Sequence, residues 1–101
     1  MVQTLKAFIY NRKGKVISIG QNSYTKTHPL QAKYAHKVGL DKKVFLHAEI
    51  DAIIKCKDIN EAYKISVLRL NRKGEPLLAK PCPICMSAIK ATNIKEINWS
   101  T

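Results

Sequence analysis

The stretches His47-Ala48-Glu49 and Pro81-Cys82-Pro83-Ile84-Cys85 decide how this chain is organised, because they hold residues of the kinds that bind metals. A zinc ion that takes part in catalysis has three protein ligands and leaves its fourth position to water. His47, Cys82 and Cys85 provide such a set, one imidazole and two thiols. Glu49 follows the histidine by two residues, where a carboxylate beside the metal can carry protons. We therefore predict a catalytic zinc site.

Two other interpretations of these residues remain open. A structural zinc would need a fourth protein ligand, which His28 or His36 can provide, but it would leave Glu49 without a role. A thioredoxin-like redox pair at the two cysteines of the second stretch would leave both His47 and Glu49 unexplained. The third cysteine, Cys56, falls roughly 180° around a helix from His47 and is predicted to be structural.

The spacing H-x-E…P-C-x-x-C resembles that of the zinc-dependent cytidine and deoxycytidylate deaminase superfamily. The resemblance runs from about Leu5 to Trp99, which is nearly the whole chain. It implies a layered α/β domain with a mixed sheet, a bound Zn²⁺ and hydrolytic deamination of a nucleobase, with Glu49 as the catalytic residue. Few residues precede the first expected strand or follow the last one. We therefore expect a deaminase core that is truncated at both ends.

Apolar periodicity and turn residues predict the order β-β-α-α-β-α-β in one domain of residues 1–101. The expected strands cover residues 5–10, 15–20, 65–70 and 94–99, and the expected helices cover 29–39, 47–57 and 82–92. The second helix should bury a stripe of Ile50, Ile53 and Ile54. The tetrapeptide Asn-Arg-Lys-Gly occurs at residues 11–14 and again at 71–74. We interpret both copies as turns rather than as a repeat or a phosphate loop.

Charge is the strongest compositional signal, with 18 Lys and Arg against 7 Asp and Glu and a formal net charge of +11. Such an excess attracts anions, including nucleotides, RNA, DNA and acidic membranes, although it also serves solubility. No apolar stretch approaches the roughly 20 residues of a membrane span, and the N-terminus does not resemble a signal peptide. We expect a cytoplasmic protein that does not enter a membrane, which agrees with cysteines used for metal binding.

The sequence is less specific about the substrate. Asn22, at the end of the second strand, matches a segment where the family places an asparagine against sugar or base. Lys26 and His28 follow in a loop expected to border the pocket, and Ala48 and Pro81 adjoin the metal ligands, so we predict substrate contacts for all five. A free cytosine nucleotide such as deoxycytidylate ranks first. The alternatives are a base within RNA or DNA, and a free base or nucleoside such as cytosine, cytidine or guanine.

Two further expectations concern activity and assembly. A deaminase-like binding module is the non-enzymatic alternative, and it should have lost Glu49 or a metal ligand, which this chain retains. Sheet surface left open by the missing terminal elements is liable to pair with another chain. The family resemblance points the same way, so we predict a homo-oligomer.

Overall fold

Five strands form a mixed sheet in the computed structural model, which describes residues 4–40 and 45–101. The strands are β1 (Thr4–Tyr10), β2 (Val16–Gln21), β3 (Lys64–Leu70), β4 (Pro76–Leu77) and β5 (Glu96–Trp99). β1 lies between β2 and β3 and is antiparallel to both, whereas β5 runs parallel to β3. The short β4 pairs with the end of β3.

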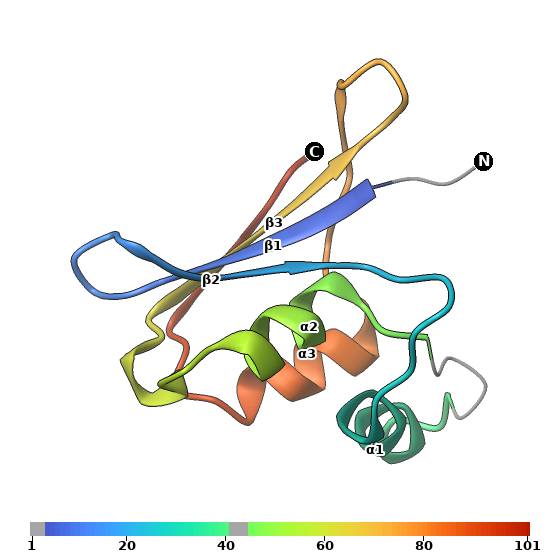
Figure 1. Ribbon diagram of the computed structural model, residues 1–101, viewed down its shortest axis with the longest axis horizontal. Helices are drawn as coiled ribbons and strands as arrows, with labels where there is room; N and C mark the ends of the chain where they lie inside the picture. Colours follow the sequence, from blue (N-terminus) through green and yellow to red (C-terminus); the bar gives the residue numbers. More distant parts are fainter. Residues whose placement is uncertain (1–3, 41–44) are drawn as a thin grey trace.

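The helices are α1 (Pro29–Lys37), α2 (Ala48–Lys55) and α3 (Pro83–Lys90), and a short 3₁₀ turn, η1 (Ile59–Glu61), follows α2. All three helices lie on the same face of the sheet, with α2 and α3 side by side (Figure 1). This is the layered α/β architecture with a mixed sheet that the sequence predicts. β4 and η1 were not predicted.

Helices α2 and α3 are shorter than expected, because His47 and Cys82 have extended backbones and serve as N-caps instead of first helical residues. Cys56 is likewise the C-cap of α2. The predicted helix from residue 29 ends at Lys37, and Gly39 follows with φ +77°. That left-handed conformation is one that glycine adopts readily.

Both copies of Asn-Arg-Lys-Gly form the same hairpin turn, as predicted. The Oδ1 atom of Asn11 accepts hydrogen bonds from the backbone N–H groups of Lys13 and Lys15, each at 3.0 Å. Asn71 accepts in the same way from Lys73 at 2.9 Å and from Glu75 at 3.0 Å. The glycines have φ +82° and +80°, which explains why glycine ends each tetrapeptide.

The core has two parts, one between sheet and helices and one among the helices. The predicted isoleucine stripe of α2 faces the helix layer: Ile50 is fully buried there, while Ile53 and Ile54 are only half-buried. Small residues face the sheet instead. A Cβ atom on Gly20 of β2 would overlap Ala48 O and Ala52 N and lie 2.8 Å from Ala52 Cα. The absence of a side chain at Gly20 therefore allows α2 to lie directly against β2.

Candidate metal centre

Two helix starts bring the predicted metal ligands together. His47 immediately precedes α2, Cys82 immediately precedes α3, and Cys85 lies in the first turn of α3. Helices α2 and α3 pack against each other, so their N-terminal ends meet. The unpaired N–H groups at these ends favour the thiolate form of cysteine.

The ligand atoms have the spacing of a zinc site. His47 Nδ1 lies 3.2 Å from Cys85 Sγ and 3.4 Å from Cys82 Sγ. The three ligand atoms all lie within 4.8 Å of one another. Tetrahedral zinc with ordinary bond lengths places nitrogen and sulfur ligands roughly 3.5 Å apart. The three side chains therefore fit a zinc ion with little movement.

The remaining histidines do not join this group. The His28 ring caps α1, because its Nδ1 atom accepts a hydrogen bond from Leu30 N at 3.0 Å. Over residues 4–40 and 45–101, the group that can hold a metal consists of His47, Cys82 and Cys85, without His28 or His36. A fourth protein ligand is thus lacking in the described part of the chain, which leaves the open position that a catalytic zinc requires.

The pKa values of the two thiols are shifted in opposite directions. The Cys85 thiol donates a hydrogen bond to the sulfur of Cys82, which lowers the pKa of Cys82 to about 4. The same hydrogen bond, together with burial, raises the pKa of Cys85. Without metal, Cys82 is therefore the thiolate and Cys85 keeps its proton. This donor set, a nitrogen and two sulfurs that become thiolates, is one that zinc prefers.

The Glu49 carboxyl group lies beside the ligands in the first turn of α2. Glu49 is only 4% exposed, and its carboxyl group lies close to the Cys85 thiol. Burial is the main cause that raises the pKa of Glu49 above the ordinary range of a glutamate. A carboxyl group with a raised pKa can both take up and release a proton near neutral pH.

A buried glutamine that the sequence analysis missed holds the histidine ligand. Gln31 of α1 has no exposed surface, and its Oε1 atom accepts a hydrogen bond from His47 N at 3.1 Å. Its position three residues before the buried Tyr34 was a signal, because residues at that spacing share a helix face. A polar residue on a buried face needs a partner, and here the partner is the metal-ligand segment.

Two hydrogen bonds fix α2 to β2 beside the centre. Asp51 is buried and accepts from Gln21 N at 2.9 Å, and it also pairs with Lys55 Nζ at 2.8 Å. Ser18 Oγ donates to Ala52 O at 2.7 Å. These bonds hold the start of α2, and with it His47 and Glu49, in a fixed position.

A cavity of about 420 Å³ opens onto the metal ligands. Its lining includes the predicted residues Asn22, Ala48 and Glu49 together with His47 and Cys82. The Oδ1 atom of Asn22 accepts from Leu5 N at 3.0 Å. The exposed Lys26 and the buried Pro81 are outside this lining, as is the helix cap His28.

The cavity also has walls that were not predicted. Phe45, 49% exposed at its edge, was not predicted, whereas Tyr24, 53% exposed, belongs to the loop after Asn22 that was expected to border the pocket. Lys80 provides a cation directly before Pro81-Cys82, and its Nζ atom lies 6.0 Å from the ring centroid of Trp99. Its place in the sequence, next to the second metal stretch, was the available signal.

Comparison with known families agrees with this centre. The sequence model of the cytidine and deoxycytidylate deaminase zinc-binding region matches residues 4–101. The chain belongs to this family. A comparison with curated protein sequences found no match.

Membership of this deaminase family confirms the resemblance seen in the sequence and the zinc cofactor expected from it. It also explains why His47, Cys82 and Cys85 lie together, since the family is defined by a zinc-binding region and these residues are positioned to bind a metal ion. The redox-pair interpretation accounts for neither finding. Among the described helices, none is long and apolar enough to cross a membrane.

Proposed function

We propose that the protein is a zinc-dependent hydrolase that deaminates a free cytosine nucleotide such as deoxycytidylate. The observation that carries this proposal is the position of Glu49, which is buried yet lines the same cavity as the metal ligands. A binding module or a structural zinc site has no use for a buried carboxyl group with a raised pKa at that place.

Glu49 is proposed to move protons in two steps. It first takes a proton from the attacking water and delivers it to the ring nitrogen, which makes the neighbouring carbon electrophilic. After the water oxygen has bonded to that carbon, Glu49 takes the remaining proton from this oxygen and passes it to the amino group. The carbon–nitrogen bond then breaks, ammonia leaves and a carbonyl remains. Zinc, when bound, would supply a water whose pKa is about 7.

The other walls of the cavity suit a nucleotide. Asn22 is proposed to contact the sugar or base from the end of β2. Backbone carbonyl groups at Pro81 or Cys82 would accept from the departing amino group, as the family resemblance implies. Tyr24 and Phe45 offer exposed rings at the edge for contact with the base or sugar.

We propose Lys80 as the partner of the phosphate group, because it lines the cavity and Lys26 does not. The Lys26 backbone closes the neighbouring loop, where its N–H donates to Ser23 Oγ at 2.8 Å and its carbonyl accepts from Leu46 N at 2.9 Å. Its side chain is exposed beyond that loop.

Ammonia release from zinc-loaded protein tests the proposal, with cytosine, cytidine, deoxycytidylate and matching adenine and guanine compounds as substrates. We expect deoxycytidylate to be turned over best. Lys80→Gln should lower kcat/KM for the nucleotide about tenfold while leaving the nucleoside unchanged, because a charge-assisted hydrogen bond is lost. Lys26→Gln serves as the matched control. Equal turnover of nucleotide and nucleoside would contradict the phosphate contact.

The nucleic-acid alternative is favoured by the exposed aromatic pair at the cavity edge and by the net charge of +11. It predicts deamination of a single-stranded oligonucleotide, with binding that weakens by a log–log slope of about −0.7 per contacted phosphate as salt is added. Oligonucleotide turnover without turnover of any mononucleotide would make this alternative the function.

A further inference from the structure

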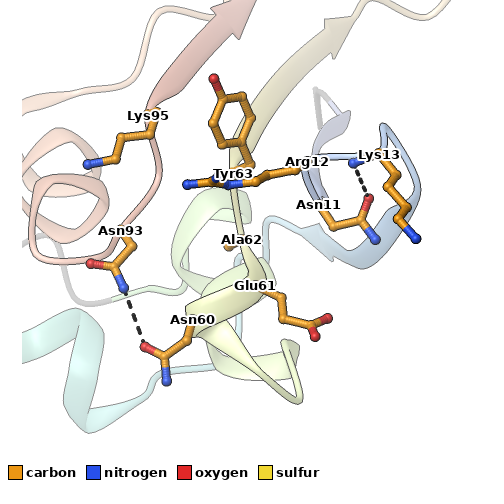
Figure 2. Close-up of a pocket in the computed structure, with 9 residues that line it drawn as sticks. All are labelled: Asn11, Arg12, Lys13, Asn60, Glu61, Ala62, Tyr63, Asn93 and Lys95. Atoms are coloured by element: carbon orange, nitrogen blue, oxygen red, sulfur yellow. Dashed lines mark hydrogen bonds between the residues drawn. The ribbon is translucent and has the colours of Figure 1, made fainter.

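A second cavity, of about 560 Å³, lies at the opposite ends of α2 and α3 from the metal centre. Three segments form it: the turn after β1, the η1 turn that follows α2, and the loop between α3 and β5 (Figure 2). It shares no lining residue with the cavity at the metal centre. The proposed deamination makes no use of it.

Cations and amide groups dominate its lining. Its lining contains three cations (Arg12, Lys13 and Lys95), one acidic residue (Glu61) and three asparagines. Figure 2 shows the side chains of Arg12 and Lys95 extending toward the same opening, with Asn93 beside them. Within residues 4–40 and 45–101, neither Arg12 nor Lys95 forms an ion pair with a carboxylate. Their charges are therefore available to a ligand.

Arg12 is exposed, but its side chain is held by a contact with an aromatic ring. Its guanidinium group lies over the ring of Tyr63, 5.6 Å from the ring centroid. This contact uses the flat face of the guanidinium and leaves its N–H edge free to donate. The backbone that carries Arg12 is fixed as well, because the Asn11 side chain closes the turn through hydrogen bonds to Lys13 and Lys15.

The three segments are also bonded to one another. Tyr63 N donates to Tyr10 O at 2.8 Å, and the Tyr63 carbonyl accepts from Lys95 N at 2.8 Å. Asn93 Nδ2 donates to Asn60 Oδ1 at 3.4 Å, which joins the loop before β5 to η1. The cavity is thus preformed, so binding would require little ordering of the chain.

We propose that this cavity binds a small phosphorylated molecule, with the phosphate group held by Arg12 and Lys95. The planar guanidinium can donate two parallel hydrogen bonds to phosphate oxygens, and the lysine supplies a second positive charge. The volume falls in the range of about 300–1,000 Å³ that is typical of small-molecule sites. A cavity of this size suits a compact phosphoester better than a continuous nucleic-acid strand, which needs an extended basic groove.

The chain contains an internal control for this proposal. The second Asn-Arg-Lys-Gly turn has the same sequence and the same side-chain hydrogen bonds as the first. Arg72, however, has no aromatic ring beneath it in the described residues and does not line the cavity. Loss of Arg72 therefore removes the same charge from the same kind of turn without affecting the proposed site.

Amide-resolved NMR titration of the zinc-loaded protein with inorganic phosphate, and separately with glycerol phosphate, tests the proposal. We expect saturable shifts at residues 12, 63, 93 and 95. The apparent Kd should rise about tenfold or more in Arg12→Gln and in Lys95→Gln, and stay unchanged in Arg72→Gln, because the first two changes each remove a charge-assisted contact. Tyr63→Leu should weaken binding severalfold although it keeps every charge.

Three results would overturn the proposal. Equal weakening in Arg12→Gln and Arg72→Gln would show diffuse attraction to the net charge instead of a site. Shifts confined to the cavity at the metal centre would place the phosphate there. Shifts at residues 12 and 95 with a single-stranded oligonucleotide, but with neither phosphate nor glycerol phosphate, would identify a nucleic-acid surface.

Discussion

Glu49 is the residue on which the proposed chemistry depends most directly. Glu49→Gln should lower turnover by about 10²-fold or more, because the amide cannot transfer the proton. Zinc content and melting temperature should change little, since Glu49 is not among the three metal ligands. Ammonia release and metal analysis on the same preparation check both parts. Cys56→Ser, at the far end of α2, is the control and should keep activity and zinc.

Gln31 should act through His47 rather than on the substrate. Gln31→Leu removes the acceptor for His47 N, so the zinc Kd should rise about tenfold, as is usual when a supporting partner of a ligand is lost. Competition with a chromogenic chelator measures this Kd, and circular dichroism checks the fold. Lys33→Leu changes an exposed residue of the same helix and should have no effect. An unaltered zinc Kd in Gln31→Leu would show that Gln31 contributes only to packing.

Zinc uptake should release about one proton from the thiol pair near neutral pH. Cys82 is already a thiolate there because its pKa is lowered to about 4, whereas the raised pKa of Cys85 keeps that thiol protonated. Coordination requires the thiolate, so apparent zinc affinity should increase about tenfold per pH unit between pH 7 and 8. Calorimetry in buffers of different ionisation enthalpy counts the proton. A pH-independent affinity would contradict this assignment.

At the scale of elements, the contact between β2 and α2 should tolerate no side chain at Gly20. Gly20→Ala should lower the free energy of unfolding by about 1–3 kcal/mol or more, because the added methyl group meets the α2 backbone at Ala48 and Ala52. Urea denaturation measures the change. Gln21→Ala, which alters an exposed neighbour and keeps the backbone bond to Asp51, is the control. A neutral Gly20→Ala would mean that α2 can move away from the sheet.

Local signals explain which elements the sequence could predict. The Asn-Arg-Lys-Gly turns and the helix starts at Pro29, His47 and Cys82 depend on residues close together in the chain, and these predictions were correct within one or two residues. The direction of the Ile50 stripe was not predictable in the same way. It depends on Gly20, about thirty residues earlier, which lets the small face of α2 take the sheet side.

The candidate site likewise combines features that follow from local sequence with features that depend on tertiary packing. Its metal ligands follow from a short spacing pattern and its zinc from the family, so both could be predicted. Gln31 and Lys80 reach the centre through tertiary packing of α1 and of the segment before α3, and the local signals that they carried did not show what they would contact. The loop cation favoured from sequence, Lys26, is near in the chain but outside the cavity lining.

For the whole molecule, the formation of a homo-oligomer stays a prediction. The described helices all lie on one side of the sheet (Figure 1). Ile19 pairs with Phe8, whose neighbours Ala7 and Ile9 are buried on the helix side, so Ile19 lies on the opposite face. Ile19 is 51% exposed there. Light scattering at micromolar concentration should give a mass above that of one chain. Ile19→Glu should lower this mass, whereas Leu78→Glu, at another exposed apolar position, should not. A monomeric mass for the unaltered protein would contradict the prediction.

The helix starts at the metal centre involve a trade-off between stability and function. His47 and Cys82 are N-caps, yet neither side chain makes a capping hydrogen bond. A conventional Ser, Thr, Asp or Asn cap stabilises a helix by about 1 kcal/mol, and this stabilisation is absent twice within one small protein. Replacing either ligand with serine, which caps helices but does not usually bind zinc, would therefore give a more stable, inactive protein that has lost a metal ligand. Selection for stability alone would remove these two residues, so their presence is itself a mark of selection for metal binding.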